Sequence, residues 1–305
     1  MLKRRGCLKT FWLAAILLLM NAFCSLAGES PAVSVLVSLN IRPYVSAVSA
    51  MTDVFKAEGG SPSVFFMADF PGKSQKILKE KLGKAGGQIF VAVGPEAARF
   101  LWTHFQDRPS PVIYTMVLNP EQISAGPAPR CGIPLQIPVQ AQVRLIGRTL
   151  PGVKRIGLLY DPKYNTAFFN RARESATIEG LQIVPLEISS KKEIPGLLEK
   201  EWASVDCLWM IPDRTIISES VIQYIIKESL LNKTPVIGYN RFFYESGAAL
   251  SFIFDYETLG VQTARLVLSI AGGEPCREND PEFQVWPNRR VIEKLGLAYA
   301  EDPEP

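Results

Sequence analysis

The sequence predicts an α/β protein with two lobes, each built on a mostly parallel sheet. Short apolar runs at 89–93 and 156–160 are each followed by a turn and a segment with helical spacing, so both open a β-turn-α unit. The two units lie about 65 residues apart. Apolar runs and helical segments alternate along the rest of the chain, and this alternation is typical of parallel sheets with right-handed crossovers.

The unit at 150–183 is the more complete of the two. Its apolar run ends before a turn that contains Pro162, and Asn165 or Thr166 can then cap a helix that stops at Gly180. Open α/β sheets bind ligands beyond the carboxyl ends of their strands. The turn is therefore expected to offer four side chains to a ligand: Tyr160, Asp161, Tyr164 and Asn165.

The unit that begins at 89–93 repeats the plan, with Gly94, Pro95 and Glu96 as its turn. Proline suits the first turn of a helix over 97–103, because an N–H at that position has no partner within the helix. The remaining N–H groups of the turn then point above the sheet, where an anion can bind.

Four apolar runs predict the strands of the first lobe: 33–39, 63–67, 89–93 and 111–117. Helical spacing predicts three helices between them: 44–56, 73–84 and 97–103. The middle helix has a basic solvent face, and Ile77, Leu78 and Leu82 are expected to point inward. The Pro- and Gly-rich segment 126–138 is expected to cross between the lobes.

The second lobe is expected to hold strands at 156–160, 182–186, 207–211 and 235–238. Its helices are expected at 139–150, 165–179, 194–201 and 219–231. A strand at 248–254, and a helix that Asp255 or Thr258 caps and that ends at Ala271, are expected to return to the first lobe. A short helix at 289–295 closes the fold.

These elements divide the chain into four parts. The first lobe takes 32–138 with 247–275, and the second takes 139–246 with 276–299. Residues 1–27 are expected to be a signal peptide, and 300–305 a mobile tail.

The amino terminus has the pattern of a cleaved secretory signal. Basic residues precede an apolar core at 11–20, and the small residues Ser25 and Ala27 in Ser25-Leu26-Ala27 suit a signal peptidase. The apolar run is too short for a comfortable membrane span. Cys24 leaves a lipoprotein as an alternative, although the bulky Phe23 is a poor approach to a lipidated cysteine. An uncleaved anchor is the third interpretation.

Removal of the signal leaves 29 basic and 30 acidic residues, a net charge of −1, because the signal holds four of the 33 basic residues. This balance indicates no nucleic-acid partner. The remaining cysteines are Cys131, Cys207 and Cys276, and their spacing fits no metal motif. Cys207 is expected inside a strand. A bridge between Cys131 and Cys276 is a hypothesis that an oxidising compartment permits.

The sequence gives little support for catalysis. Its one histidine, His104, is expected on the outer part of a helix, so a His-based metal site lacks ligands. The nucleophile turn G-x-S-x-G and the dinucleotide turn G-x-G-x-x-G are both absent from the sequence. Residues 71–74 resemble the end of a phosphate loop, but Met67 stands where that motif needs its first glycine. We therefore expect a binding protein, not an enzyme, with no metal and no cofactor.

Polar residues or glycines follow almost every predicted strand. Turns favour Asn, Asp and Gly in any protein, so one such residue alone carries little information. All of these residues fall on the same edge of the two sheets, and that edge faces a cleft. Beyond the two turns above, the expected contacts are Asn40, Tyr44, Asp69, Asn119, Asp213, Asn240, Asp255 and Tyr256. The aromatic residues among them can pack against a planar ligand, with core packing as the open alternative.

From Val33 to Leu297 the chain resembles the periplasmic substrate-binding proteins of ABC transporters. The likeness is to the uncharacterised-transport family that includes tryptophan and tyrosine binders. Residues 150–162 match a family segment LPxxxxIGxxYxP, and Asn165 matches a family Asn. Further matches are 94–98, 119–120, 212–213, 247–250, 255–260 and 288–297. The chain departs from the family at 67–70, where Asn-Ala-Gln-Gly is usual, and at Gly94, where Thr or Ser is usual.

The resemblance implies two Rossmann-like lobes of the type I periplasmic binding protein architecture, which close by a hinge on a small molecule. It implies the solute-binding component of an ABC importer: a periplasmic monomer that delivers a ligand such as an amino acid to an ABC permease in the inner membrane. In such a site the 94–96 turn would bind an anionic group, and Asp161, Asp213 and Asp255 would bind an amine or hydroxyls. The alternative is a secreted module that signals ligand occupancy to a membrane receptor.

Overall fold

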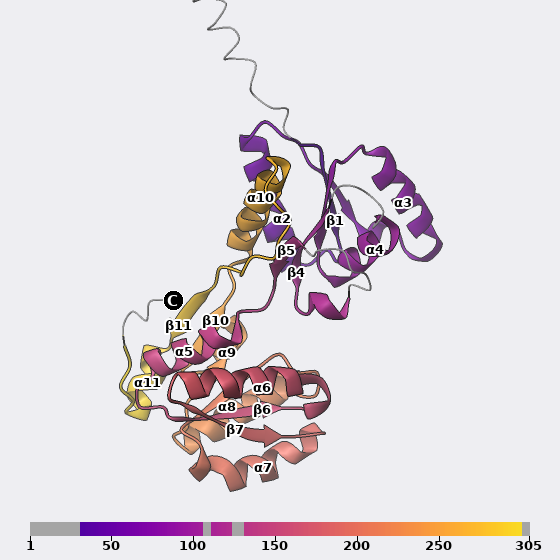
Figure 1. Cartoon of the computed structure of the whole chain (residues 1–305). Helices are drawn as coiled ribbons and strands as arrows, with labels where there is room; N and C mark the ends of the chain where they lie inside the picture. The colour runs from indigo at the N-terminus through magenta and orange to yellow at the C-terminus, as the bar shows by residue number, and fades with distance from the viewer. Residues whose placement is uncertain (1–30, 106–110, 124–130, 301–305) are drawn as a thin grey trace, which may run out of the picture.

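The computed structural model describes residues 31–105, 111–123 and 131–300. Figure 1 shows two bodies, each organised around one sheet. The first sheet has five strands in the order β2-β1-β3-β4-β5, and the second has six in the order β11-β10-β9-β8-β6-β7. We call the bodies around these sheets lobe one and lobe two. This arrangement confirms the predicted two-lobed α/β fold.

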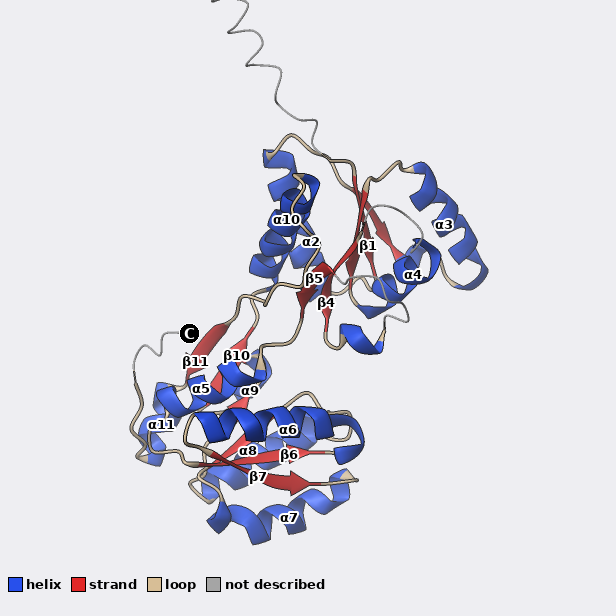
Figure 2. Ribbon diagram, viewed as in Figure 1, coloured by secondary structure: helices blue, strands red, loops and turns tan. Residues whose placement is uncertain are grey.

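Lobe one holds β1 (Val33–Val37), β2 (Ser63–Phe66), β3 (Ile89–Val93), β4 (Val112–Val117) and β5 (Cys131–Pro134). Its helices are α2 (Arg42–Ala57), α3 (Gln75–Lys84), α4 (Pro95–Phe105) and α10 (Tyr256–Ala271). Short 3-10 turns occupy η2 (Met67–Asp69), η3 (Gly72–Ser74) and η4 (Pro120–Gln122). In Figure 2, α2 and α10 cover one face of the sheet, and α3 and α4 cover the other.

The strands of lobe one form because they are apolar on both faces. Every residue of β1, β3 and β4 is buried, as is usual for a parallel sheet covered by helices on both sides. All strand pairs in this sheet are parallel. Gly260 lets α10 approach α2 closely, because a Cβ there would lie 2.1 Å from the Ala47 carbonyl oxygen.

Lobe two holds β6 (Arg155–Tyr160), β7 (Gln182–Glu187), β8 (Cys207–Met210), β9 (Val236–Gly238), β10 (Leu250–Ile253) and β11 (Gln284–Pro287). Its helices are α5 (Val139–Thr149), α6 (Pro162–Ile178), α7 (Ile194–Glu201), α8 (Glu219–Leu231), α9 (Arg241–Ser246) and α11 (Arg289–Leu295). Short 3-10 turns occupy η5 (Lys191–Glu193) and η6 (Trp202–Ser204).

Two apolar cores hold the sheet of lobe two between its helices. One core joins α5, α6 and α11 to the strands, and the other joins α7, α8 and α9 to the opposite face. β11 pairs antiparallel with β10, while the other pairs in this sheet are parallel.

Three connections cross between the lobes. The chain leaves lobe one after β5, returns after β10 and leaves again after α10 to form β11. A Cys131–Cys276 disulfide ties β5 to the last of these connections, across 145 residues of sequence. The hypothesis of this bridge is therefore confirmed, and Cys207 is buried in β8 with a free thiol, as expected.

The structure corrects the expected lobe boundary near residue 250. The strand expected at 248–254 was placed with 247–275 in lobe one, but β10 pairs with β9 and β11 in the sheet of lobe two. The chain therefore returns to lobe one only after Ile253. Sequence periodicity identifies a strand but not its neighbours, which explains the error.

Other differences concern short or irregular elements. The expected crossing 126–138 contains β5, so the connection is reduced to the residues after Pro134. Asp161, not Asn165 or Thr166, caps α6, because Pro162 begins the helix and the Asp161 carboxylate accepts from the Lys163 amide. α9 and β11 were not predicted. Ile77 is 51% exposed, whereas Leu78 and Leu82 point inward as expected.

The expected signal peptide at 1–27, with the lipoprotein alternative at Cys24, lies outside the described residues, as do residues 301–305 of the expected tail. Among the helices at 31–105, 111–123 and 131–300, none is both long and apolar enough to cross a membrane.

Candidate functional site

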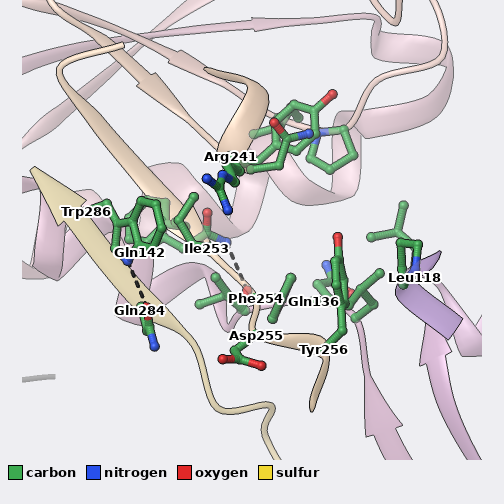
Figure 3. Close-up of a pocket in the computed structure, with 18 of the residues that line it drawn as sticks. Leu118, Gln136, Gln142, Arg241, Ile253, Phe254, Asp255, Tyr256, Gln284 and Trp286 are labelled. Carbon is green, nitrogen blue, oxygen red and sulfur yellow. Dashed lines mark hydrogen bonds between the residues drawn. The ribbon is translucent and has the colours of Figure 1, made fainter. Parts of the chain in front are cut away.

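A cavity of about 980 Å³ lies where the two lobes meet. Lobe one contributes the start of α2, the residues after β4 and the start of α10. Lobe two contributes the start of α6, the residues after β8 and β9, and the strand β11. Two segments where the chain crosses between the lobes, at 135–137 and 253–255, also line the cavity. Figure 3 shows part of this lining.

Five of the residues expected to contact a ligand line the cavity: Asn119, Asn165, Asn240, Asp255 and Tyr256. They come from both lobes and follow the carboxyl ends of strands or cap the next helix. This edge of a parallel sheet is where α/β proteins place their ligand sites.

Asp161 and Asp213 form a buried network behind the cavity wall of lobe two. Asp213 is 1% exposed, and its Oδ2 accepts from the Asp161 amide at 2.8 Å and from the Asn165 Nδ2 at 2.6 Å. Its Oδ1 accepts from the Thr215 amide at 2.8 Å. The Thr215 hydroxyl in turn donates to the Asp161 Oδ2 at 2.6 Å. Both carboxylates are engaged inside the protein, so the expectation that they meet the ligand directly is not supported by their positions.

This network fixes the orientation of Asn165. Its Nδ2 donates to a carboxylate, so the amide oxygen Oδ1 is the atom available to the cavity. Asn165 therefore offers an acceptor, and a ligand N–H or O–H can donate to it.

The turn at 94–96 in lobe one is closed by neighbouring side chains. The Ser38 hydroxyl accepts from the Ala97 amide at 2.9 Å, and the Gly94 amide donates to the Thr115 carbonyl oxygen. Pro95 has no N–H, so of the three turn residues only Glu96 can offer a backbone amide to an anion. The ring of Tyr44 lies against Gly94, where a Cβ would be 2.8 Å from the ring. The turn does not line the cavity.

Helix caps leave polar atoms at the cavity. The Asp255 Oδ1 accepts from the amides of Glu257 and Thr258 and caps α10, which leaves its Oδ2 for a ligand. The Asn240 Oδ1 accepts from the Phe243 amide and caps α9, which leaves its Nδ2 as a donor. Asp255 was one of two caps that the sequence predicts for this helix.

Three tyrosines near the lobe interface are held in the neutral form. Burial raises the pKa of Tyr256, and burial with the nearby Asp213 carboxylate raises the pKa of Tyr239. Burial, with Glu96 and Tyr256 close by, also raises the pKa of Tyr44. Their hydroxyls can therefore donate as well as accept at neutral pH.

The remaining expected contacts do not line this cavity. Tyr160 is buried in the core of lobe two, where it stacks on Phe169 and donates to Glu187 at 2.8 Å. Tyr164 is 43% exposed beneath the Arg214 guanidinium. Asn40 is exposed after β1, and Asp69 is exposed after the edge strand β2. Tyr160 and Tyr164 thus contact side chains of their own lobe, and Asn40 and Asp69 are exposed outside this cavity.

Several lining residues were not predicted: Arg42, Gln136, Gln142, Arg241, Glu245, Gln284 and Trp286. Gln142 lies in α5, and its Nε2 donates to the Ile137 carbonyl oxygen at 2.9 Å, which fixes one crossing connection. Arg241, Gln284 and Trp286 belong to α9 and β11, the elements that the sequence analysis missed. A turn signal at Asn240 and the β-favouring run at 284–286 were the available clues.

Metal binding has no structural support in the described part of the chain, where no group of three or more His, Cys, Asp or Glu side chains could hold an ion.

Residues 72–302 match the family model described as ABC transporter substrate binding protein. No curated protein matches the chain.

Solved structures show the same fold. A conserved domain protein from Vibrio cholerae is 22% identical, covers 90% of this chain and 97% of its own, and has a TM-score of 0.56. An ABC domain from Streptococcus pneumoniae in complex with L-Trp is 21% identical with the same coverage and a TM-score of 0.59. The ligand-free, open structure of a substrate-binding protein with adhesive properties from Clostridium difficile is 17% identical, covers 89% and 97%, and has a TM-score of 0.73.

Proposed function

Because the chain belongs to the family of ABC transporter substrate-binding proteins, we propose that it captures an amino acid in the cavity between its lobes and delivers it to an ABC importer. The observation that carries this proposal is the cavity itself. Both sheets direct strand ends to it, and two connections between the lobes line it. A hinge motion at these connections would bring the two walls together around a ligand.

The size of the cavity agrees with a mechanism in which the two lobes close around a bound ligand. Ligand pockets commonly enclose about 300–1,000 Å³, and this cavity of about 980 Å³ stands at the upper end of that range. A single amino acid fills only part of it. Rotation of the lobes would reduce the volume and remove the ligand from water.

The lining has the mixture of groups that an amino acid needs. Phe168, Tyr239, Phe254 and Trp286 provide apolar and aromatic surface. Arg241 and Asp255 provide charges of opposite sign. One structural neighbour was solved with L-Trp, which makes aromatic amino acids the first ligands to test.

The proposed role requires a location outside the cytoplasm. The signal-like amino terminus supports export, and the disulfide in lobe one is stable in an oxidising compartment. The proposed partners are the amino acid and the permease of the importer, with the chain acting as a monomer and as a carrier, not as an enzyme.

Isothermal titration of the exported protein against the twenty amino acids tests the proposal. Ser46 lines the cavity on α2, and Ser49 on the same helix is exposed outside it. Ser46→Trp should place a bulky ring between the two walls, prevent their closure on a ligand and abolish binding, whereas Ser49→Trp should bind like the unaltered protein. No heat with any amino acid would discard the proposed ligand class, and binding that survives Ser46→Trp would place the site elsewhere.

A further inference from the structure

We infer that Arg241 is the receptor for the ligand's carboxylate, and that Asp255 and Asn165 receive its amine. This inference rests on the proposed function and deepens it, because it states how the ligand is oriented. It replaces the 94–96 turn, which the sequence suggested for the anionic group, with residues that line the cavity.

The Arg241 guanidinium forms a hydrogen bond within the protein through one of its three nitrogens. Its Nε donates to the Glu245 Oε1 at 2.7 Å, one helical turn further along α9. Arginine carries five N–H donors in a planar fork, so the two terminal nitrogens keep donors for a second partner. A carboxylate matches the spacing of such a fork and can accept two parallel hydrogen bonds.

The strand β11 supports this arginine from one side. The Arg241 guanidinium carbon lies 6.0 Å from the centre of the Trp286 ring, within the range of a cation–π contact. The Trp286 ring is itself fixed, because its Nε1 donates to the Gln284 Oε1 at 2.8 Å and Tyr244 packs edge-on at 5.3 Å. The Arg241 side chain is 71% exposed, and these contacts favour one of its orientations before a ligand arrives, which lowers the entropy that binding must overcome.

The proposed acceptors for the ligand's amine are Asp255, on the connection between β10 and α10, and Asn165, on α6 of lobe two. Asp255 keeps one carboxylate oxygen beyond its helix cap, and Asn165 presents its amide oxygen because Asp213 holds its nitrogen. An ammonium has donors only, so it suits both acceptors. Figure 3 shows Arg241 above Asp255 in the view, with the Phe254 label between them.

This arrangement selects ligands that carry both charges. A ligand without a carboxylate leaves the terminal nitrogens of Arg241 without an acceptor from the ligand when the cleft closes, and one without an amine leaves the Asp255 Oδ2 without a donor from it. Desolvation of a polar atom that has no hydrogen-bond partner is costly, so each missing group should weaken binding. Arg42 and Glu257 also line the cavity and, like Arg241 and Asp255, are exposed. Arg241 is preferred to Arg42 because Glu245 accepts from its Nε and the Trp286 ring packs near its guanidinium.

The test compares three probes by titration: the amino acid that binds most tightly, its decarboxylated amine and its deaminated acid. For tryptophan these are L-tryptophan, tryptamine and indole-3-propionate. Arg241→Gln should weaken binding of the amino acid roughly 10- to 100-fold and leave tryptamine nearly unchanged. Asp255→Asn keeps the cap oxygen, and it should weaken L-tryptophan but not indole-3-propionate.

Two further variants distinguish direct contact between Arg241 and the ligand from the contribution of Glu245, which positions Arg241. Glu245→Gln removes the ion pair of Arg241 but not its free fork, so it should retain most of the affinity, and Arg241→Lys should restore part of it. Arg290→Gln, an exposed change on α11 outside the cavity, should have no effect.

The outcomes distinguish the two proposals. Failure of the unaltered protein to bind any amino acid removes the proposed function and this orientation with it. Binding of the amino acid with unchanged affinity in Arg241→Gln overturns the orientation alone. An equal loss for the amino acid and its amine in Arg241→Gln also overturns it, because that result means a supporting role for the arginine.

Discussion

Lobe one and lobe two hold the cleft-facing edges of their sheets in different ways. In lobe two the edge is stabilised by buried carboxylates, with Asp213 accepting three hydrogen bonds and joining the ends of β6 and β8. In lobe one the edge is packed by Tyr44 against Gly94, and a disulfide ties β5 to the connection after α10. Apolar side chains stand exposed there, among them Leu39 and Leu118.

This difference indicates that the two lobes have different roles in ligand binding. A hydrogen-bonded edge presents polar atoms in fixed directions, as Asn165 shows, and so lobe two can recognise the polar groups of a ligand. An apolar edge gains stability when it is covered, so lobe one can provide the wall that closes over the ligand. The predictions below test the comparison, beginning with the largest expected effect.

Asp213→Ala should be the most destabilising change. It leaves one buried and two partly buried donors without an acceptor, and at about 1–3 kcal/mol for each the loss of stability should be about 4 kcal/mol. Ser38→Ala removes one amide partner in lobe one and should cost about 1 kcal/mol. Urea unfolding followed by circular dichroism measures both. Equal losses in the two variants would mean that the lobes are stabilised alike.

Loss of the disulfide should affect lobe one and spare lobe two. The double variant Cys131→Ser/Cys276→Ser should lose about 2–4 kcal/mol, because the bridge closes a long loop of the unfolded chain. Hydrogen exchange should become faster in β5 and its partner residues 277–279, but not in β6 or β8. The unaltered protein treated with a dithiol reductant should behave like the variant. Identical unfolding of the oxidised and reduced forms would contradict this prediction.

Gly94→Ala tests the packed turn of lobe one. Gly94 has a φ of 92°, and an added Cβ would lie 2.7 Å from the Ser38 hydroxyl and 2.8 Å from the Tyr44 ring. Backbone strain and the clash together should cost about 2 kcal/mol. Gly152→Ala in lobe two is the matched control, because its Cβ would meet nothing within 4 Å. Thermal unfolding that shifts equally in both variants would show that the turn is not tightly packed.

The smallest effect concerns alkaline pH. Burial raises the pKa of Tyr44, Tyr239 and Tyr256, so these residues stabilise the folded state below the unfolded pKa of about 10, and this contribution is lost as the pH rises further. Two of the three belong to lobe one. Stability measured from pH 8 to 11 should therefore decline less in Tyr44→Phe/Tyr256→Phe than in Tyr239→Phe. If stability falls more steeply with pH in Tyr44→Phe/Tyr256→Phe than in Tyr239→Phe, the buried tyrosine of lobe two, not those of lobe one, makes the larger contribution.

Most of the regular elements could be predicted because they have strong local signals. The buried run 89–93 is β3, and the predicted bounds of α7, α8 and α11 agree with the structure. The strands β5 and β11 were not predicted from the sequence, because each is four residues long, contains proline and lies at a sheet edge. Their existence depends on a neighbouring strand that the local sequence does not reveal.

The candidate site was predictable only in part, for a related reason. Asn119, Asn165, Asn240, Asp255 and Tyr256 line the cavity, as their places after strands suggest. Asp161 and Asp213 stand at equivalent places, but each has partners within lobe two. Arg241 and Trp286 meet only because β11 joins a sheet formed by earlier parts of the chain.

The sequence by itself determined the class of fold and the edge of the sheets that lines the candidate site, because apolar periodicity and turn residues act over a few neighbouring positions. Only the tertiary structure decided which polar side chains turn inward to one another and which remain for a ligand. Hydrogen bonds such as that between Asn165 and Asp213 join residues 48 positions apart, and no local pattern specifies which partner a carboxylate or amide will find.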